Sequence, residues 1–217
     1  MFLYEGASGA KTTILLAHGA GAPMDSRAMA AASGALAAAG LRVARFEFDY
    51  MAGRRGGTRR PPPRAQALIP EFHAALDKLA PEGDLIIGGK SMGGRVASMI
   101  ADDVFRAGRI RGLLCLGYPF HPPGKPDQLR TQHLVALETP ALIVQGTRDP
   151  FGVPDEVASY GLSPHIALLW LEDGDHDLVP RKRLTGLSAT DHLATMAKAV
   201  ATWSANLRRP AGPGASG

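Results

Sequence analysis

Residues 89–93 read Gly-Lys-Ser-Met-Gly, a G-x-S-x-G sequence that stands between an apolar run and a helical pattern. A serine on a sharp turn from strand to helix has a strained backbone, and only very small residues two positions before and after it avoid a collision. Gly89 and Gly93 meet that demand, although a glycine-rich packing turn is an alternative interpretation. The pattern predicts Ser91 as a nucleophile that attacks a carbonyl carbon once a base has removed its proton.

The base and the acid that such a serine needs follow two later apolar runs. His176 comes directly after the run at residues 166–171, whereas the other histidines lie in predicted helices, between strands or in the first turn. Asp149 follows the run at residues 141–145, where an ordinary turn aspartate before proline is the alternative. A neutral histidine takes the proton of the serine, and a carboxylate fixes the tautomer of that histidine. Along the chain the nucleophile Ser91 comes first, then the acid Asp149 and then the base His176. This order is evidence for the three roles that is independent of the G-x-S-x-G sequence.

Two backbone N–H groups are expected to stabilise the oxyanion that forms when a serine attacks a carbonyl. One belongs to Met92, the residue after the nucleophile. The other is expected in the turn at residues 18–23, where small side chains let the backbone approach a substrate. Ala20 is the first candidate there and Gly21 the second. His18, in the same turn, is expected to form structural hydrogen bonds and not to act as the base.

Short apolar runs alternate with helical patterns along the chain, as they do in repeated βαβ units. The predicted strands are residues 12–17, 42–48, 84–88, 112–117, 141–145 and 166–171, with residues 2–4 as an added edge strand. All but the second of the six are nearly continuous apolar runs, which is typical of a parallel sheet covered on both faces. We therefore predict an α/β fold class with a doubly wound, mostly parallel sheet. Ligands of such sheets bind beyond the carboxyl ends of the strands, where the polar turns should meet.

Four helices are expected in the gaps between these strands. Residues 26–39 are rich in alanine, with Asp25 as the expected N-cap and Gly40 as the residue that ends the helix. Residues 70–79 form a second predicted helix, and a third is predicted to start beside Gly93 and Gly94. The last, at residues 191–207, carries a continuous apolar stripe that we expect to pack on the sheet.

Length and composition predict one globular domain. The 217 residues are 45% hydrophobic and 20% charged, which excludes a disordered chain and a collagen-like fibre. Residues 1–207 are predicted to form a single domain and residues 208–217 a flexible tail. Cys115 is the single cysteine and is flanked by leucines, so we expect it to be buried in a protein of a reducing compartment. Residues 1–11 show no signal pattern, and no apolar run approaches the roughly 18 residues that span a bilayer, so we expect a cytoplasmic protein without a membrane partner.

Basic residues are concentrated in the segment 51–64, which contains no acid and is predicted to be a loop. Its arginines alone exceed the formal net charge of +4, and they are Arg54, Arg55, Arg59, Arg60 and Arg64. A solvated loop is the favoured interpretation, and contact with an anionic substrate or with nucleic acid is the weaker one.

Metal and cofactor motifs fail on spacing. Asp173, Asp175 and Asp177 alternate like the start of a calcium loop, but the sixth and twelfth positions of that loop are Leu178 and Leu184. The P-loop spacing and the dinucleotide fingerprint are also missing. We therefore expect no metal and no cofactor.

Over nearly its whole length the chain resembles the α/β-hydrolase superfamily, and within it the small lidless members similar to dienelactone hydrolase. A narrower resemblance rests on the segments at residues 18–21, 48–51, 89–95, 130–134 and 145–152. It points to a group with uncharacterised bacterial hydrolases, a testis-expressed animal protein and a subunit of the NSL chromatin acetyltransferase complex. The resemblance implies an α/β-hydrolase fold with Ser91 as nucleophile, Asp149 as acid and His176 as base. Dienelactone hydrolase itself uses a cysteine nucleophile, so the serine is a departure from it.

A minimal lid, or none, is expected because only residues 118–140 separate two strands between which larger lipases insert a lid domain. A shallow open site suits small soluble esters better than long-chain triglycerides. The expected function is a serine hydrolase that cleaves a small carboxylic ester or thioester through an acyl-enzyme intermediate. The alternative is a non-catalytic interaction protein that uses the α/β-hydrolase fold as a scaffold.

Overall fold

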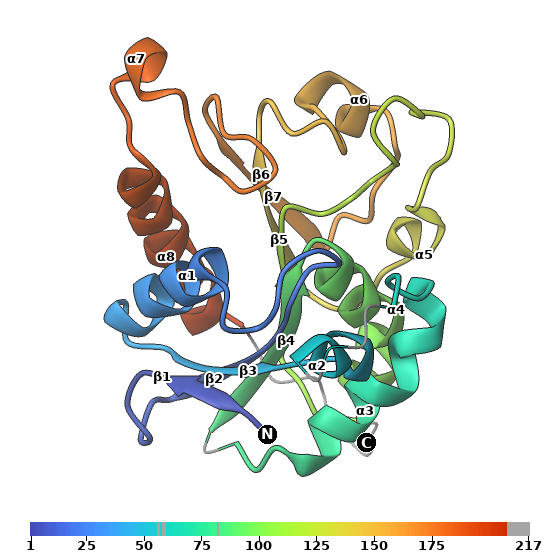
Figure 1. Ribbon diagram of the computed structural model, residues 1–217, viewed down its shortest axis with the longest axis vertical. Helices are drawn as coiled ribbons and strands as arrows, with labels where there is room; N and C mark the ends of the chain where they lie inside the picture. Colours follow the sequence, from blue (N-terminus) through green and yellow to red (C-terminus); the bar gives the residue numbers. More distant parts are fainter. Residues whose placement is uncertain (56, 58–59, 82, 208–217) are drawn as a thin grey trace, which may run out of the picture.

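The computed structural model describes residues 1–55, 57, 60–81 and 83–207. In this part of the chain seven strands form one sheet in the order β1-β3-β2-β4-β5-β6-β7 (Figure 1). The strands are β1 Leu3–Glu5, β2 Thr12–Ala17, β3 Arg42–Phe46, β4 Asp84–Lys90, β5 Gly112–Leu116, β6 Ala141–Gly146 and β7 Ile166–Leu171. All neighbouring strands are parallel except β1, which pairs with β3 in the antiparallel direction. The predicted α/β fold class with a mostly parallel sheet is confirmed.

Helices cover both faces of the sheet, with α1 and α8 on one side and α3 and α4 on the other (Figure 1). The helices are α1 Arg27–Ala38, α2 Asp49–Arg55, α3 Ile69–Lys78, α4 Met92–Arg106, α5 Gln132–Val135, α6 Pro154–Ala158, α7 Lys182–Thr185 and α8 Ala189–Ala205, with the 3-10 helix η1 at Ala65–Leu68. Alternate residues of β2 enter different cores: Ile14 and Leu16 pack with α1 and α8, and Leu15 and Ala17 with α3 and α4. Burial on both faces explains why the strand sequences are continuously apolar.

Two predicted helix starts are wrong, and capping explains both. Ser26, not Asp25, is the N-cap of α1, since its side chain accepts a hydrogen bond from the backbone N–H three residues further on. Gly40 follows the C-cap with φ 88°, as its predicted role as the terminating residue requires. α8 begins two residues before the predicted start at Asp191, because Asp191 and Ser188 form a reciprocal capping box.

The segment 51–64 begins as a helix, which the prediction of a loop missed. α2 carries Tyr50 and Met51, which are buried in the core beneath α3 and α4. Asp49 lies in the first turn of α2, where its negative charge interacts favourably with the helix dipole. β3 therefore ends at Phe46 and not at residue 48 as predicted. The predicted tail at residues 208–217 lies outside the described residues.

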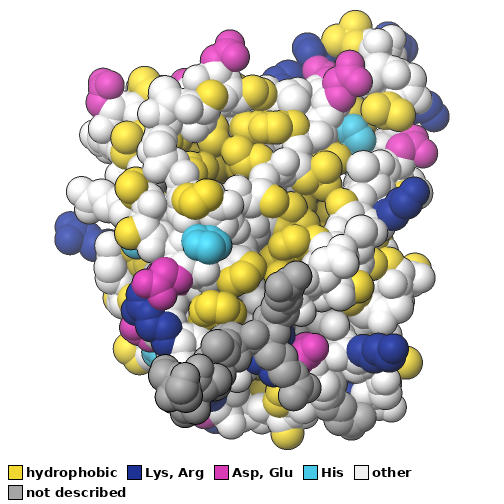
Figure 2. Space-filling view, turned by 180° about the vertical axis from the view of Figure 1, so that it is seen from behind, with side chains coloured by type: hydrophobic (Ala, Val, Ile, Leu, Met, Phe, Trp, Pro, Cys, Tyr) yellow, Lys and Arg dark blue, Asp and Glu magenta, His cyan; other side chains and the backbone are white. Residues whose placement is uncertain are grey.

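The exposed surface shows how the charges and apolar groups are distributed. Seen from behind, hydrophobic side chains gather in the middle of the molecule, while lysines and arginines are scattered near its margins (Figure 2). This face therefore presents no continuous basic patch in the part of the chain that the structure describes. Cys115 is completely buried in β5, as expected. Among the described helices none combines the length and the apolar composition needed to span a bilayer.

Candidate active site

Ser91 lies in the turn between β4 and α4 and has the strained backbone of a nucleophile elbow. Its φ of 50° and ψ of −115° are outside the regions that L-residues ordinarily adopt. A Cβ on Gly93 would lie 2.6 Å from the carbonyl oxygens of Ala17 and His18, and one on Gly89 would collide with the Gly93 backbone. The two glycines are therefore required because the first turn of α4 packs directly on the end of β2.

The structure brings Ser91, His176 and Asp149 into one hydrogen-bonded chain. The Oγ of Ser91 lies 2.9 Å from Nε2 of His176, and Nδ1 of His176 lies 2.8 Å from Oδ2 of Asp149. Because the carboxylate can only accept, Nδ1 carries the proton and Nε2 is left to accept the serine hydroxyl. This geometry is the one needed to remove a proton from a serine hydroxyl.

Asp149 is fully buried, and neighbouring donors compensate its charge. Besides His176, its carboxylate accepts hydrogen bonds from Nε2 of Gln145 and from the backbone N–H of Phe151, both at 2.9 Å. Gln145 in turn accepts a 2.7 Å hydrogen bond from the backbone N–H of Tyr118. The sequence interpretation assigned no role to Gln145, although it is a polar side chain inside the apolar run of β6 and begins one of the segments that carry the narrower resemblance.

Backbone contacts join the turn that carries Asp149 to the loop that carries His176. Thr147 donates to the carbonyl of Leu171 at 3.0 Å, and Arg148 to that of Gly174 at 2.9 Å. A Cβ on Gly146 would overlap the carbonyl group of Gly174. The acid and the base are therefore placed by two neighbouring strands whose carboxyl ends are locked together.

Lys90, at the end of β4, also contacts the loop that carries His176. Its Nζ donates a 2.6 Å hydrogen bond to the backbone carbonyl of His176 and lies 3.4 Å from the carboxylate of Asp177. The side chain is 14% exposed, and burial lowers the pKa of its ammonium group, although the nearby carboxylates oppose this shift. Sequence reasoning assigned no role to Lys90.

A cavity of about 500 Å³ opens beside Ser91. It is lined by Ala20, Pro63, Arg64, Ala65, Gln66, Ser91, Met92, Arg95, Pro119, Arg130 and Phe151. The ring of Phe151 lies 4.2 Å from the imidazole of His176, centre to centre. Met92 and Ala20, the first candidates for the oxyanion donors, both line this cavity, whereas Gly21 is not among its lining residues.

The turn at residues 18–23 is fixed by buried hydrogen bonds. Nε2 of His18 accepts from the backbone N–H of Phe48 at 3.1 Å, and Nδ1 donates to the carbonyl of Gly19 at 2.6 Å. The hydroxyl of Tyr50 donates to the carbonyl of Ala20 at 3.1 Å. His18 thus has the structural role that its sequence position suggested.

A second serine and histidine pair, Ser98 and His133, lacks the features of a nucleophile and its base. Ser98 is 3% exposed in the middle of α4, and its hydroxyl donates to the carbonyl of Arg95 and contacts Nε2 of His133, both at 2.8 Å. No carboxylate hydrogen-bonds to His133 among the residues described. Burial and the charge of Arg95 lower the pKa of His133 to about 4. Ser98 is therefore held as a structural hydroxyl out of reach of an ester.

The aspartates that alternate after β7 shape the loop that carries His176. Asp173 forms an ion pair with Arg181, whose hydrogen bonds hold the pKa of that carboxyl well below its usual range. The carboxylate of Asp175 accepts from the backbone N–H groups of Asp177, at 2.9 Å, and Val179, at 3.0 Å. Their oxygens are thus directed at protein donors.

The parallel sheet and the elbow at its carboxyl edge are the architecture of an α/β hydrolase. The sequence profile of the family described as "Alpha/beta hydrolase domain" matches residues 10–205. The chain belongs to this family.

Solved structures from several bacteria share the fold. The esterase domain of a Rhodothermus marinus protein is 16% identical, with a TM-score of 0.66 over 95% of this chain and 92% of that one. Dienelactone hydrolase from Anabaena variabilis is 20% identical, with a TM-score of 0.69 over 94% and 91%. A serine hydrolase without lid from Xanthomonas campestris is 20% identical, with a TM-score of 0.65 over 97% and 89%.

Proposed function

We propose that the protein is a serine hydrolase that cleaves a small carboxylic ester or thioester through an acyl-enzyme intermediate. The observation that carries this proposal is the hydrogen-bonded chain from Ser91 through His176 to Asp149, which begins at a strained elbow and opens into a cavity. The similar folds of an esterase domain and of a lidless serine hydrolase support the same class of reaction.

In the first half of the reaction Ser91 attacks the carbonyl carbon of the ester. A bond forms between Oγ and that carbon while the hydroxyl proton passes to Nε2 of His176. The N–H groups of Met92 and Ala20, with Gly21 as the second candidate in that turn, stabilise the oxyanion. The bond to the leaving group then breaks, and His176 gives its proton to the departing alkoxide or thiolate.

In the second half water releases the acyl group. His176, which is neutral again, takes a proton from a water molecule while the oxygen of that water attacks the acyl carbon. The bond between the acyl carbon and Ser91 Oγ then breaks. The proton on Nε2 returns to the serine oxygen, and the carboxylic acid leaves. Asp149 keeps its charge throughout and stabilises the imidazolium that forms in each half.

The non-catalytic alternative receives less support. A scaffold does not need a strained serine, a base and a buried acid within hydrogen-bond distance of one another. Membership of the narrower group with the testis-expressed protein and the chromatin-complex subunit stays a prediction. The cytoplasmic location likewise stays a prediction.

Labelling with a fluorophosphonate probe, followed by peptide mapping, tests the proposal together with turnover of p-nitrophenyl acetate. We expect the label on Ser91, and we expect Ser91→Ala to lower kcat by roughly 10³-fold or more while the fold stays intact. Ser98→Ala is the matched control and should keep the label and most of the turnover. A folded wild-type protein that neither reacts with the probe nor hydrolyses esters would overturn the proposal.

A further inference from the structure

Three arginines surround the cavity beside Ser91. Arg64 precedes η1, Arg95 lies in the first turn of α4, and Arg130 lies just before α5. Within the described part of the chain none of the three forms an ion pair, and no carboxylate lines this cavity. The space next to the proposed nucleophile is therefore strongly positive.

Two of these arginines are half-buried and close enough to affect each other. Burial lowers the pKa of Arg130, and the charge of Arg95 lowers it further. The Nε of Arg95 is buried without a hydrogen-bond partner among the described residues. A buried donor of this kind costs free energy unless an acceptor reaches it, and two like charges repel when nothing lies between them.

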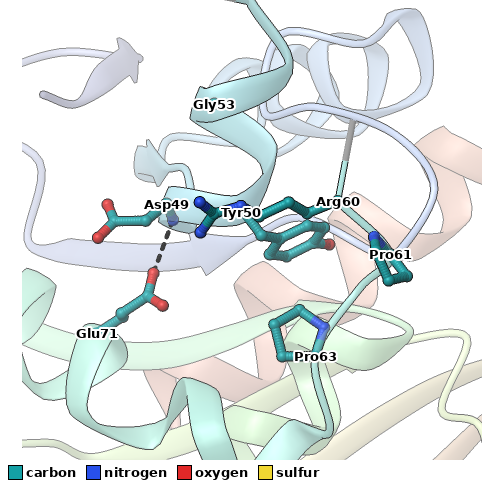
Figure 3. A pocket seen from close by; sticks show the side chains of 7 residues that line it. All are labelled: Asp49, Tyr50, Gly53, Arg60, Pro61, Pro63 and Glu71. Atoms are coloured by element: carbon teal, nitrogen blue, oxygen red, sulfur yellow. Dashed lines mark hydrogen bonds between the residues drawn. The ribbon is translucent and has the colours of Figure 1, made fainter. Parts of the chain in front are cut away.

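Several other arginines of the described residues form ion pairs, as Arg111 does with Asp84. A neighbouring cavity of about 390 Å³ shares Pro63 with the first, and Arg60 and Tyr50 are among its lining residues (Figure 3). Asp49 and Glu71 line that cavity together with Arg60, and Glu71 accepts a 2.7 Å hydrogen bond from the backbone of Asp49. The side cavity is thus supplied with negative charge, and the cavity at Ser91 is not.

We propose that the cavity takes an ester whose molecule carries a second group, a carboxylate, which Arg95 and Arg130 bind while the ester carbonyl lies at Ser91. This inference rests on the proposed function and names its substrate class. The planar guanidinium group presents two parallel N–H donors that match the two oxygens of a carboxylate. Arg64, which is exposed, attracts the anion to the mouth of the cavity.

The same charges disfavour a long apolar acyl chain. A hydrocarbon chain placed against two guanidinium groups would remove their water and supply no acceptor in return. The cavity of about 500 Å³ has room for a short diacid monoester or an acetylated hydroxy acid. The charges lining the cavity therefore favour an anionic ester.

Two pairs of substrates test the inference, and each pair compares an acid with its neutral amide. In the first pair, 4-acetoxybenzoate and 4-acetoxybenzamide, the carboxylate or amide lies on the alcohol side of the ester. In the second pair, monomethyl glutarate and methyl glutaramate, it lies on the acyl side. Each kcat/KM is divided by the rate of alkaline hydrolysis of the same ester, which corrects for its intrinsic reactivity. In one of the two pairs we expect this ratio to be at least tenfold higher for the acid than for the amide. Raising the ionic strength from about 0.05 M to about 0.5 M should reduce this preference, since salt screens the attraction.

The variants Arg95→Gln and Arg130→Gln should each lower kcat/KM for the preferred acid by about tenfold. Their kcat/KM for the corresponding amide should stay within about twofold of the wild-type value. Arg109→Gln removes the same charge from a distant surface pair with Asp77 and should change neither rate. Thermal melting checks that each variant folds. The wild-type comparison of acid with amide needs no variant at all.

Calorimetry with Ser91→Ala separates this inference from the proposed function. That variant should bind 4-hydroxybenzoate or glutarate in preference to the corresponding amide, whether or not the wild-type protein turns over. Turnover that depends on Ser91 with equal rates for acid and amide in both pairs, and with no selective binding, would overturn the inference and leave the proposed function standing. Selective binding of the acid to a protein without hydrolase activity would support the anion site and overturn the function.

Discussion

At the scale of single residues, the position of His176 depends on Lys90 as much as on Asp149. Asp149 holds the imidazole through Nδ1, while Lys90 holds the backbone carbonyl of the same residue. Lys90 also directly precedes Ser91, so one short segment of chain carries the nucleophile and the group that fixes its base. Lys90 touches no reacting atom and is a positioning residue.

Lys90→Met should therefore reduce turnover more than substrate binding. Methionine keeps the buried stem but loses the donor to the carbonyl of His176, and we expect kcat to fall about tenfold with KM within about twofold. Labelling of Ser91 by fluorophosphonate should slow in parallel. Lys78→Met, which changes an exposed lysine of α3, should leave both rates unaltered. Equal losses in the melting temperatures of the two variants, with kcat unchanged, would refute a positioning role.

At the scale of elements, the distance between α4 and the end of β2 decides whether the elbow can form. Gly93 is the point of closest approach, because its missing side chain lets the carbonyl oxygens of Ala17 and His18 reach the first turn of α4. Gly34 occupies a helix too, but nothing lies within 4 Å of where its Cβ would stand. The two helical glycines therefore have opposite expected responses to alanine.

Gly93→Ala should destabilise the protein by about 3 kcal/mol and abolish labelling of the serine, since α4 must move away from β2. Gly34→Ala should stabilise it by about 0.5–1 kcal/mol, because alanine favours the helix and restricts the unfolded chain. Urea unfolding of both variants measures the two changes. Similar effects of the same sign would show that the contact with β2 is unimportant.

At the scale of the whole molecule, the free energy of unfolding should decrease in acid because the half-buried His133 resists protonation. His133 lies in α5 and hydrogen-bonds to Ser98 of α4, and the other groups that interact with it are Arg95, Asp102 and Tyr118. Its pKa is about 4 in the folded protein and near 6.5 in the unfolded chain. Between these values the unfolded chain binds a proton that the folded protein does not, so unfolding becomes easier as the pH falls through this window.

His133→Gln should flatten this dependence. We expect the free energy of unfolding of the wild-type protein to decrease between about pH 6.5 and pH 4 more steeply than that of the variant, by about 1–3 kcal/mol over the window. Urea titrations at a series of pH values measure the difference. Parallel curves for the two proteins would exclude His133 as a source of the acid sensitivity.

Much of this architecture could be predicted from the sequence because local patterns report local constraints. Continuous apolar runs indicated strands buried on both faces, and the spacing of Gly89, Ser91 and Gly93 indicated an elbow. Helix ends were less accurate, as at Ser26 and Ser188, because several neighbouring polar side chains compete for one cap. Short helices such as α2 were missed, since their stability comes from tertiary burial of residues such as Tyr50.

The sequence by itself determined the fold class and nominated Ser91, Asp149 and His176, because strand-forming segments and turns are recognised from local residue types. Only the tertiary structure decided which further residues meet at that edge of the sheet. Lys90, Gln145, Arg95 and Arg130 stand in segments that carry the family resemblance, but their roles arise from distances between segments far apart in the chain. Such distances depend on how strands and helices pack, which no short sequence pattern encodes.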